Sequence, residues 1–474
     1  CACAPNVNEH TWRCATAADC AEGYQCDRLQ GVCVVAYKGE NGVFEDRILL
    51  GMSAPLDDNT AVGAIGQAAV AGVETCFAHF NSRGGVHGRQ LELKVLDDGY
   101  DASRTSENVS SLIGADQRQV FALMGVIGTG PSLAARVVAL EQRVLFFGPA
   151  TGFDGLEPDP PDRYIFNIRP RYSEEAQQLT RHLLHHTEPP TGKENIALFA
   201  QGVDDVGTLD DFGRSGARGV VETLKTLGVA ESAIPHLSYR AGASSEVGPA
   251  VTGLLTWLAN SDRATVAGRI YAGVVMVALG EAALTFLREV ENQLAMARRG
   301  SPPDSRYGTF SAEEIDRLAV VELRFTTLSV LDSSFANALA ALGKYTSVDQ
   351  QGKEVLRHYG EGLVAAIPVP PLDSSASGVL QYRTHMQQFR PEEQISAVSL
   401  EAYIGALLLV EGLRRHGRDI IDESVIDTLE ELRVDFGIGT TLEFSKNDHQ
   451  ASSKLWGAQL DEKLAFHTIG ALGE

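Results

Sequence analysis

Residues 78–101 read AHFNSRGGVHGRQLELKVLDDGYD, and this stretch indicates the fold class more directly than any other. It overlaps the end of a helical pattern that covers about residues 64–80. Apolar and charged side chains then alternate over residues 91–96, as they do along a β-strand. A second helical pattern follows over about residues 103–113, and an apolar run of strand length precedes the first helix at residues 48–52. This order of strands and helices predicts a parallel sheet with helices on its faces.

The same alternation continues along most of the chain. Apolar runs at residues 120–126 and 144–147 flank a helix that begins near Pro131. The pattern recurs at residues 195–230, 270–298 and 320–343, and the last third contains helical patterns at about 376–389, 397–415 and 423–433. Two such blocks predict an α/β protein with two doubly wound parallel-sheet lobes.

Length and charge agree with this organisation and exclude some partners. A chain of 474 residues corresponds to two or three domains. It has 62 acidic residues against 40 basic ones, a net charge of −22, which repels phosphate backbones and anionic lipids. We therefore expect no nucleic-acid partner. No run of about 20 residues is apolar enough to span a bilayer.

Six of the seven cysteines lie within the first 33 residues, ahead of a cysteine-poor body. From Cys14 the spacing is C-x5-C-x5-C-x6-C, through Cys20 and Cys26 to Cys33. This pattern predicts a small disulfide knot, typical of an oxidising compartment. Four cysteines allow three pairings and the sequence does not choose among them; our expectation is 14–26 with 20–33. Zinc is the alternative, but no C-x2-C or C-x4-C pair is present.

The first and the last cysteine of the sequence, Cys1 and Cys76, have separate interpretations. Cys1 begins the sequence and resembles the acylated N-terminal residue of bacterial lipoproteins; an arbitrary start of the chain is the equal alternative. We keep Cys1 as the lipidation candidate, which would provide the one contact with a membrane. Cys76 lies within a helical run, and we expect a buried free thiol there.

Candidate binding loops follow the strands, because ligands of open parallel sheets bind beyond the carboxyl ends of the strands. The loops are residues 51–56, 128–132 and 148–153. In the second, Thr129 can cap a helix, Gly130 lets a ligand approach the backbone, and Pro131 suits the first helical position. Free N–H groups at a helix N-terminus bind anions, and the acidic net charge favours a small carboxylate over a phosphate. The alternative is that these are ordinary capped turns.

Motifs for catalysis and cofactors are missing from the sequence. It contains neither the G-x-x-x-x-G-K-[ST] nucleotide loop nor the G-x-S-x-G nucleophile elbow. His182, His185 and His186 share one helical face, for which a solvated patch is the better explanation than a metal site. We therefore expect no catalytic residue, no metal and no cofactor.

Residues 78–101 also resemble a known family, the extracellular ligand-binding receptors of ABC transporters, which are type I periplasmic binding proteins of the leucine/isoleucine/valine-binding kind. In that family a helix ends in Asn-x-x-Gly-Gly, and Gly-(Arg/Lys), a strand and Asp-Asp follow. The matching residues are Asn81, Gly84, Gly85, Gly88, Arg89, Asp97 and Asp98. Further similar motifs lie at residues 164–175, 211–213, 361–364, 399–413 and 437–444, so the resemblance covers roughly 47–465.

The resemblance implies two lobes joined by a three-strand hinge. Lobe 1 would comprise residues 47–168 plus 369–439, and lobe 2 residues 169–368 plus 440–474. Residues 1–46 would form the cysteine-rich segment and a linker. The two lobes would close on a small ligand.

The resemblance also implies ligand contacts. A ligand carboxylate would meet Ser53, Thr129, Gly130, Ala150, Thr151 and Gly152. Asp332 would hold an ammonium group, although a helix N-cap explains it equally well. Phe212 lies in the first loop of the second lobe, and Ile65 and Leu279 replace aromatic pocket residues of the family. These replacements fit a more apolar acid or an amide as well as a branched amino acid.

We therefore expect a periplasmic or cell-surface solute-binding protein without catalysis, which captures an amino acid or another small carboxylate for an ABC permease. The alternative is a sensory or interaction lipoprotein on the same fold, because transport does not require a cysteine knot. An enzyme would need a nucleophile–base pair or a metal cluster.

Overall fold

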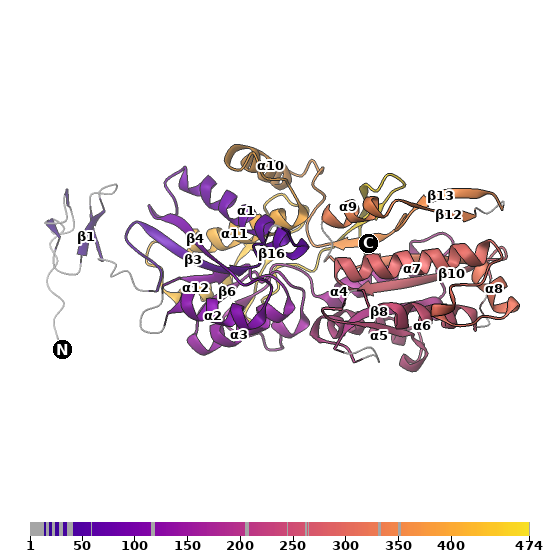
Figure 1. The fold of residues 1–474 in the computed structure, drawn as a ribbon. Helices are drawn as coiled ribbons and strands as arrows, with labels where there is room; N and C mark the ends of the chain where they lie inside the picture. Colours follow the sequence, from indigo (N-terminus) through magenta and orange to yellow (C-terminus); the bar gives the residue numbers. More distant parts are fainter. Residues whose placement is uncertain are drawn as a thin grey trace.

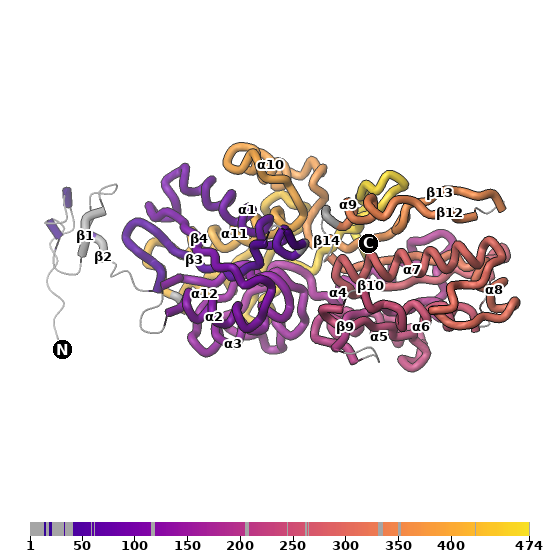
Figure 2. Tube along the Cα trace, viewed as in Figure 1, coloured from indigo at the N-terminus to yellow at the C-terminus, as the bar shows by residue number. Residues whose placement is uncertain are grey.

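The computed structural model describes residues 41–473 apart from 58, 115–118, 204–207, 244, 261–262, 264, 330–332 and 349–351. Before residue 41 it describes residues 14–15, 19–20, 24–27 and 32–35. Cys1 and Asp332, two of the residues singled out from the sequence, lie outside the described residues. The body of the chain forms two lobes side by side (Figure 1), and the Cα trace passes between them more than once (Figure 2).

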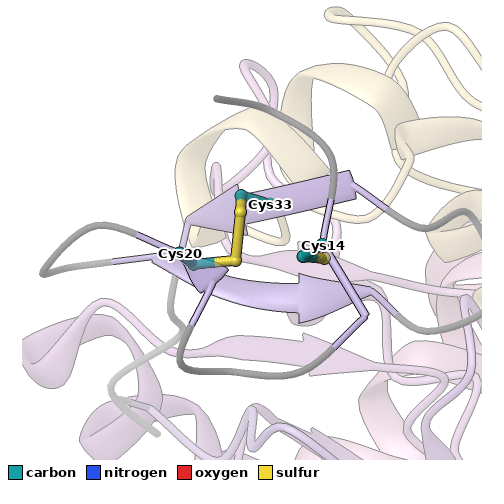
Figure 3. A group of neighbouring side chains, drawn as sticks. All are labelled: Cys14, Cys20 and Cys33. Atoms are coloured by element: carbon teal, nitrogen blue, oxygen red, sulfur yellow. A yellow bond between two sulfur atoms is a disulfide. The ribbon is translucent and has the colours of Figure 1, made fainter. Parts of the chain in front are cut away.

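The N-terminal segment contains an antiparallel hairpin, β1 (Tyr24–Asp27) with β2 (Val32–Val35). A disulfide joins Cys20 to Cys33, which confirms that expected pair (Figure 3). Cys14 is also disulfide-bonded, but the side chain of Cys26, its expected partner, lies outside the described part of the chain. The sulfurs of Cys14, Cys20 and Cys33 lie within 4.8 Å of one another. Because metals bind thiolates, these oxidised sulfurs do not form a zinc site.

Lobe 1 is built on a parallel five-stranded sheet with the order β4-β3-β5-β6-β7. Its strands are β3 (Arg47–Ala54), β4 (Gln90–Asp97), β5 (Ala122–Met124), β6 (Leu145–Phe147) and β7 (Ile165–Phe166). Helices α1 (Ala61–Asn81) and α11 (Ala397–His416) cover one face, and α2 (Ala102–Ile113) and α3 (Thr129–Gln142) cover the other. The lobe is doubly wound, as the sequence predicted.

The C-terminal part of the chain adds the remaining elements of lobe 1. They are α10 (Ser377–Phe389), α12 (Asp422–Leu429), β15 (Arg433–Val434) and β16 (Leu442–Glu443). Cys76 of α1 is fully buried in the core of lobe 1. It is a free thiol, as expected.

Lobe 2 contains a seven-stranded sheet with the order β18-β17-β14-β11-β10-β8-β9. The five strands β9, β8, β10, β11 and β14 are parallel to one another. β17 and β18 continue the sheet beyond β14 as antiparallel strands. The strands are β8 (Ile196–Gly202), β9 (His236–Arg240), β10 (Ile270–Val277), β11 (Val321–Thr327), β14 (Val364–Ile367), β17 (Trp456–Leu460) and β18 (Phe466–Ala471).

Helices cover both faces of this second sheet as well. One face packs against α4 (Tyr172–His185) and α5 (Asp211–Thr226). The other packs against α6 (Gly248–Ala259), α7 (Gly280–Arg298), α8 (Ala312–Ala319) and α9 (Ser333–Leu342). A hairpin of β12 (Lys344–Val348) and β13 (Glu354–His358) lies at the end of this lobe. Among the described residues, no helix combines the length and apolar character of a membrane span.

Three segments connect the lobes, after β7, after β14 and before β17. The first and third lie side by side, because Asn167 and Gln450 form a parallel bridge. We place the third crossing after Ala451 rather than at residue 439, where the resemblance put it. β16 pairs with β15, and Phe444 and Ala451 belong to the core of lobe 1. Short strand pairs carry little hydrophobic pattern, so this extension of lobe 1 could not be predicted from local periodicity.

Candidate functional site: the cleft between the lobes

A cleft lies between the lobes at the carboxyl ends of the lobe 1 strands, and about 950 Å³ of space, part of it open to solvent, lies between its walls. One face of α1 contributes Val62, Ile65, Ala69 and Val73, and one face of α11 contributes Val398, Glu401, Ala402 and Gly405. Both sets follow the i, i+3/i+4, i+7 spacing that brings side chains onto one side of a helix. The wall formed by lobe 1 is therefore largely apolar.

Five residues singled out from the sequence line this cleft. They are Ile65, Thr129, Ala150, Phe212 and Leu279. They come from both lobes, and the bridge between Ile127 and Ala150 brings the loops after β5 and β6 together. The structure thus assembles these residues around one space, and their contact with a ligand stays a prediction.

Four other candidates do not line the cleft. The Ser53 hydroxyl is fully buried and donates to Oδ2 of Asp98 over 2.8 Å. A buried carboxylate requires hydrogen-bond donors, and the Ser53 hydroxyl supplies one of them from within the protein. Gly130 is exposed, and the carbonyl of Gly152 accepts the N–H of Tyr172. Thr151 lies behind Thr129, with 3.0 Å between the two hydroxyl oxygens.

Sequence reasoning missed Tyr100, which lines the cleft from the turn after β4. The two carboxylates before it build this turn, since Asp97 accepts the N–H of Gly99 and Asp98 accepts that of Tyr100. Tyr100 itself has φ +65°, a left-handed conformation that is uncommon for a tyrosine. The resemblance covers Asp97 and Asp98, but it carries no indication that the turn they build places the Tyr100 ring at the cleft.

A second group missed from the sequence surrounds Arg169, which leaves β7 and enters the first crossing. Its Nη2 donates to Glu175 of α4 over 2.8 Å and also contacts the hydroxyl of Ser329. Its Nη1 lies 3.4 Å from Oε1 of Glu401 on α11. Arg169 therefore connects both lobes at the back of the cleft, with its side chain only 6% exposed.

Burial changes the ionisation of the groups in this region. It raises the pKa of the Tyr100 and Tyr172 phenols, so both rings act as neutral hydrogen-bonding groups. Burial also raises the pKa of Glu401; Arg169 lowers it and Glu175 raises it again. Burial opposes the charge of Arg169, but Glu401 and Glu175 together raise its pKa, so it stays charged.

Comparison with known families identifies the architecture. The model of the family described as periplasmic binding protein matches residues 48–291 and 333–465, which is most of the two lobes. The chain belongs to the periplasmic binding protein family. Proteins of this family are extracytoplasmic. The family and its fold are those of solute-binding proteins.

Solved structures show how widely this binding-protein architecture occurs. A possible leucine/isoleucine/valine-binding protein from Rhodopirellula baltica is 26% identical with a TM-score of 0.69, and the match covers 90% of this chain and 96% of that one. A substrate-binding periplasmic protein from Ralstonia solanacearum is 23% identical, with a TM-score of 0.66 and coverage of 89% and 99%. A fatty acid ABC transporter substrate-binding protein from Thermomonospora curvata is 16% identical, with a TM-score of 0.67 and coverage of 92% and 94%.

A curated relative matches a shorter part of this periplasmic binding protein. Leu/Ile/Val-binding protein homolog 2 from Brucella abortus is 30% identical over 121 residues. The match covers 26% of this chain and 31% of that relative, less than a third of its length. The resemblance seen in the sequence to this kind of protein is confirmed.

Proposed function

We propose that this protein binds a small carboxylate-bearing ligand with a sizeable apolar part between its lobes and delivers it to an ABC permease, without catalysing a reaction. The observation that carries the proposal is the composition of the cleft. Apolar side chains from α1 and α11 face Phe212 and Leu279 of the second lobe across one space. Burying apolar ligand surface against such walls gives about 25 cal/mol per Å².

The start of α3 supports a carboxylate as the polar part of the ligand. Gly128 occupies the N-cap position and supplies no side chain to cap the first turn. Thr129, the first residue of this turn, lines the cleft, so its N–H and hydroxyl lie where the helix dipole favours an anion. Structures with this fold were solved with isoleucine and with benzoate, and both ligands contain a carboxylate.

Binding would be coupled to closure of the lobes. A ligand that contacts both walls stabilises the closed arrangement more than the open one, and this difference in affinity shifts the equilibrium. Three connecting segments permit a hinge motion, and they keep the two walls of the cleft facing each other.

Isothermal titration calorimetry against L-leucine, L-isoleucine, benzoate and octanoate tests the proposal, with small-angle X-ray scattering to measure closure. We expect at least one ligand to bind and to make the particle more compact. Ile65→Glu, which places a charge on the apolar wall, should lower that affinity about tenfold or more. Val137→Glu is the matched control, because Val137 is 53% exposed on α3. Absence of binding across a wide carboxylate panel, with unchanged scattering, would refute the proposal.

The second candidate is a sensory or interaction lipoprotein on the same fold. The disulfide-bonded hairpin that precedes the lobes favours it, because capturing a ligand does not need this segment. Acylation of Cys1 would provide its anchor. A membrane permease encoded beside this gene would support transport, whereas a neighbouring sensor kinase would support sensing.

A further inference from the structure

The two carboxylates at the back of the cleft differ in how well they are neutralised. Glu175 accepts hydrogen bonds from Nη2 of Arg169 at 2.8 Å, from the Ser329 hydroxyl at 2.7 Å and from the Ser329 N–H at 2.8 Å. Its side chain is completely inaccessible to solvent. Glu175 and Arg169 therefore form a complete, closely bonded ion pair.

Glu401 accepts fewer and longer hydrogen bonds than Glu175 does. Within the described part of the chain its one hydrogen-bond donor is Nη1 of Arg169, at 3.4 Å, longer than a well-formed charge-assisted bond. Its side chain is 13% exposed and lines the cleft, whereas Glu175 lies behind it. Among the described residues that line the cleft, Arg169 and Glu401 are the charged ones, and the charge of Arg169 is already engaged by Glu175.

We propose that Glu401 determines specificity by binding a positively charged nitrogen of the ligand. Two carboxylates share one guanidinium, and Glu401, which lines the cleft, accepts one long hydrogen bond from it within the described part of the chain, so Glu401 has room for a further donor. A protonated nitrogen supplies both the charge and the hydrogen bonds. The partly exposed position lets a ligand reach Glu401 without breaking the Arg169–Glu175 pair.

Because Glu401 lies on α11, lobe 1 would recognise the positively charged nitrogen of the ligand. Glu401 lies on the same face as Val398, Ala402 and Gly405, so the nitrogen would lie beside the apolar wall and not in the solvent. The expected ligands are then only those carboxylates that also have a protonated nitrogen. It is a compound with an apolar body and a protonated nitrogen, for which a simple fatty or aromatic acid is a poor substitute.

This inference rests on the proposed function, and paired probes separate the two. Each pair has one carbon skeleton with and without the ammonium group: L-leucine and 4-methylpentanoate, L-isoleucine and 3-methylpentanoate, L-phenylalanine and 3-phenylpropanoate. Calorimetry on the wild-type protein should give the ammonium member of at least one pair about tenfold to hundredfold higher affinity, the range expected for one hydrogen bond between charged groups.

Glu401→Gln keeps the shape of the side chain and removes its charge, and it should abolish most of this preference while the deaminated partner binds unchanged or more tightly. Glu411→Gln is the matched control on the same helix, where Glu411 pairs with Arg414 and Arg415 away from the cleft. It should keep the wild-type preference. Circular dichroism of both variants confirms that they are folded.

The outcomes are distinct. Deaminated acids that bind as well as their ammonium partners, or a preference that persists in Glu401→Gln, would overturn the inference and leave the proposed function intact. Binding of neither member of any pair, nor of benzoate or octanoate, would overturn the proposed function and the inference with it.

Discussion

Replacing Arg169 with methionine should destabilise the protein more than replacing any one of the carboxylates around it. Its side chain is 6% exposed and that of Glu175 is 0% exposed, with 2.8 Å between their atoms. Removing one member of such a buried pair usually costs about 3–5 kcal/mol, because the other charge loses its partner in a poorly solvated place. Here two carboxylates, Glu175 and Glu401, would lose it together, so we expect the upper part of that range.

Urea unfolding followed by circular dichroism measures the effect. Glu175→Gln should cost less than Arg169→Met, because the guanidinium can still pair with Glu401. The double variant Arg169→Met with Glu175→Gln should recover more than half of the loss, since most of it comes from the unpaired charge. If Arg169→Met costs less than about 1 kcal/mol, or if the double variant is no better than the single one, the ion-pair reasoning is incorrect.

Three further perturbations follow from the structure. Gly128→Ala should weaken ligand binding, because a Cβ there would lie 2.4 Å from the Tyr100 ring at a φ of +93°; Gly130→Ala is the control, with no other atom closer than 4.0 Å, and calorimetry compares the two. Burial raises the pKa of Glu291 to about 8, so its contribution to stability is greatest below pH 4.5 and is lost as the pH rises towards 8. Glu291→Gln should therefore raise the melting temperature at pH 8 more than at pH 5, and an equal shift at both would contradict this. Deleting residues 1–40 should leave the affinity for the ligand unchanged, and a large loss in calorimetry would show that this segment contributes to the site.

Periodicity made the fold predictable from the sequence. Strand and helix positions in both lobes followed from runs such as 48–52 and 64–80, because burial imposes a period of two on strands and of about 3.6 on helices. The helix expected at 423–433 is shorter, and α12 ends at Leu429 before the short pair of β15 and β16. Two-residue strands are set by tertiary contacts, so no local pattern could predict them.

The cleft was only partly predictable. Loops that follow parallel strands converge by geometry, and Thr129 and Ala150 of two such loops line the cleft, while their contact with a ligand stays a prediction. Ser53 lies at an equally suitable place in the sequence, but the buried Asp98 takes its hydroxyl. Arg169 and Glu401 are 232 residues apart, and their meeting depends on how a crossing segment and a late helix come together in space. Single-sequence reasoning has no means of pairing them.

The path of the chain has a consequence for its synthesis. Lobe 1 needs α11 from residues 397–416 and the stretch up to Ala451 to complete its core, and lobe 2 needs β17 and β18 from residues 456–471 to complete its sheet. Neither lobe can therefore complete its core or its sheet before these late residues have been synthesised. Both lobes stay incomplete while the earlier elements emerge from the ribosome, and both then become complete over the same late stretch of the chain.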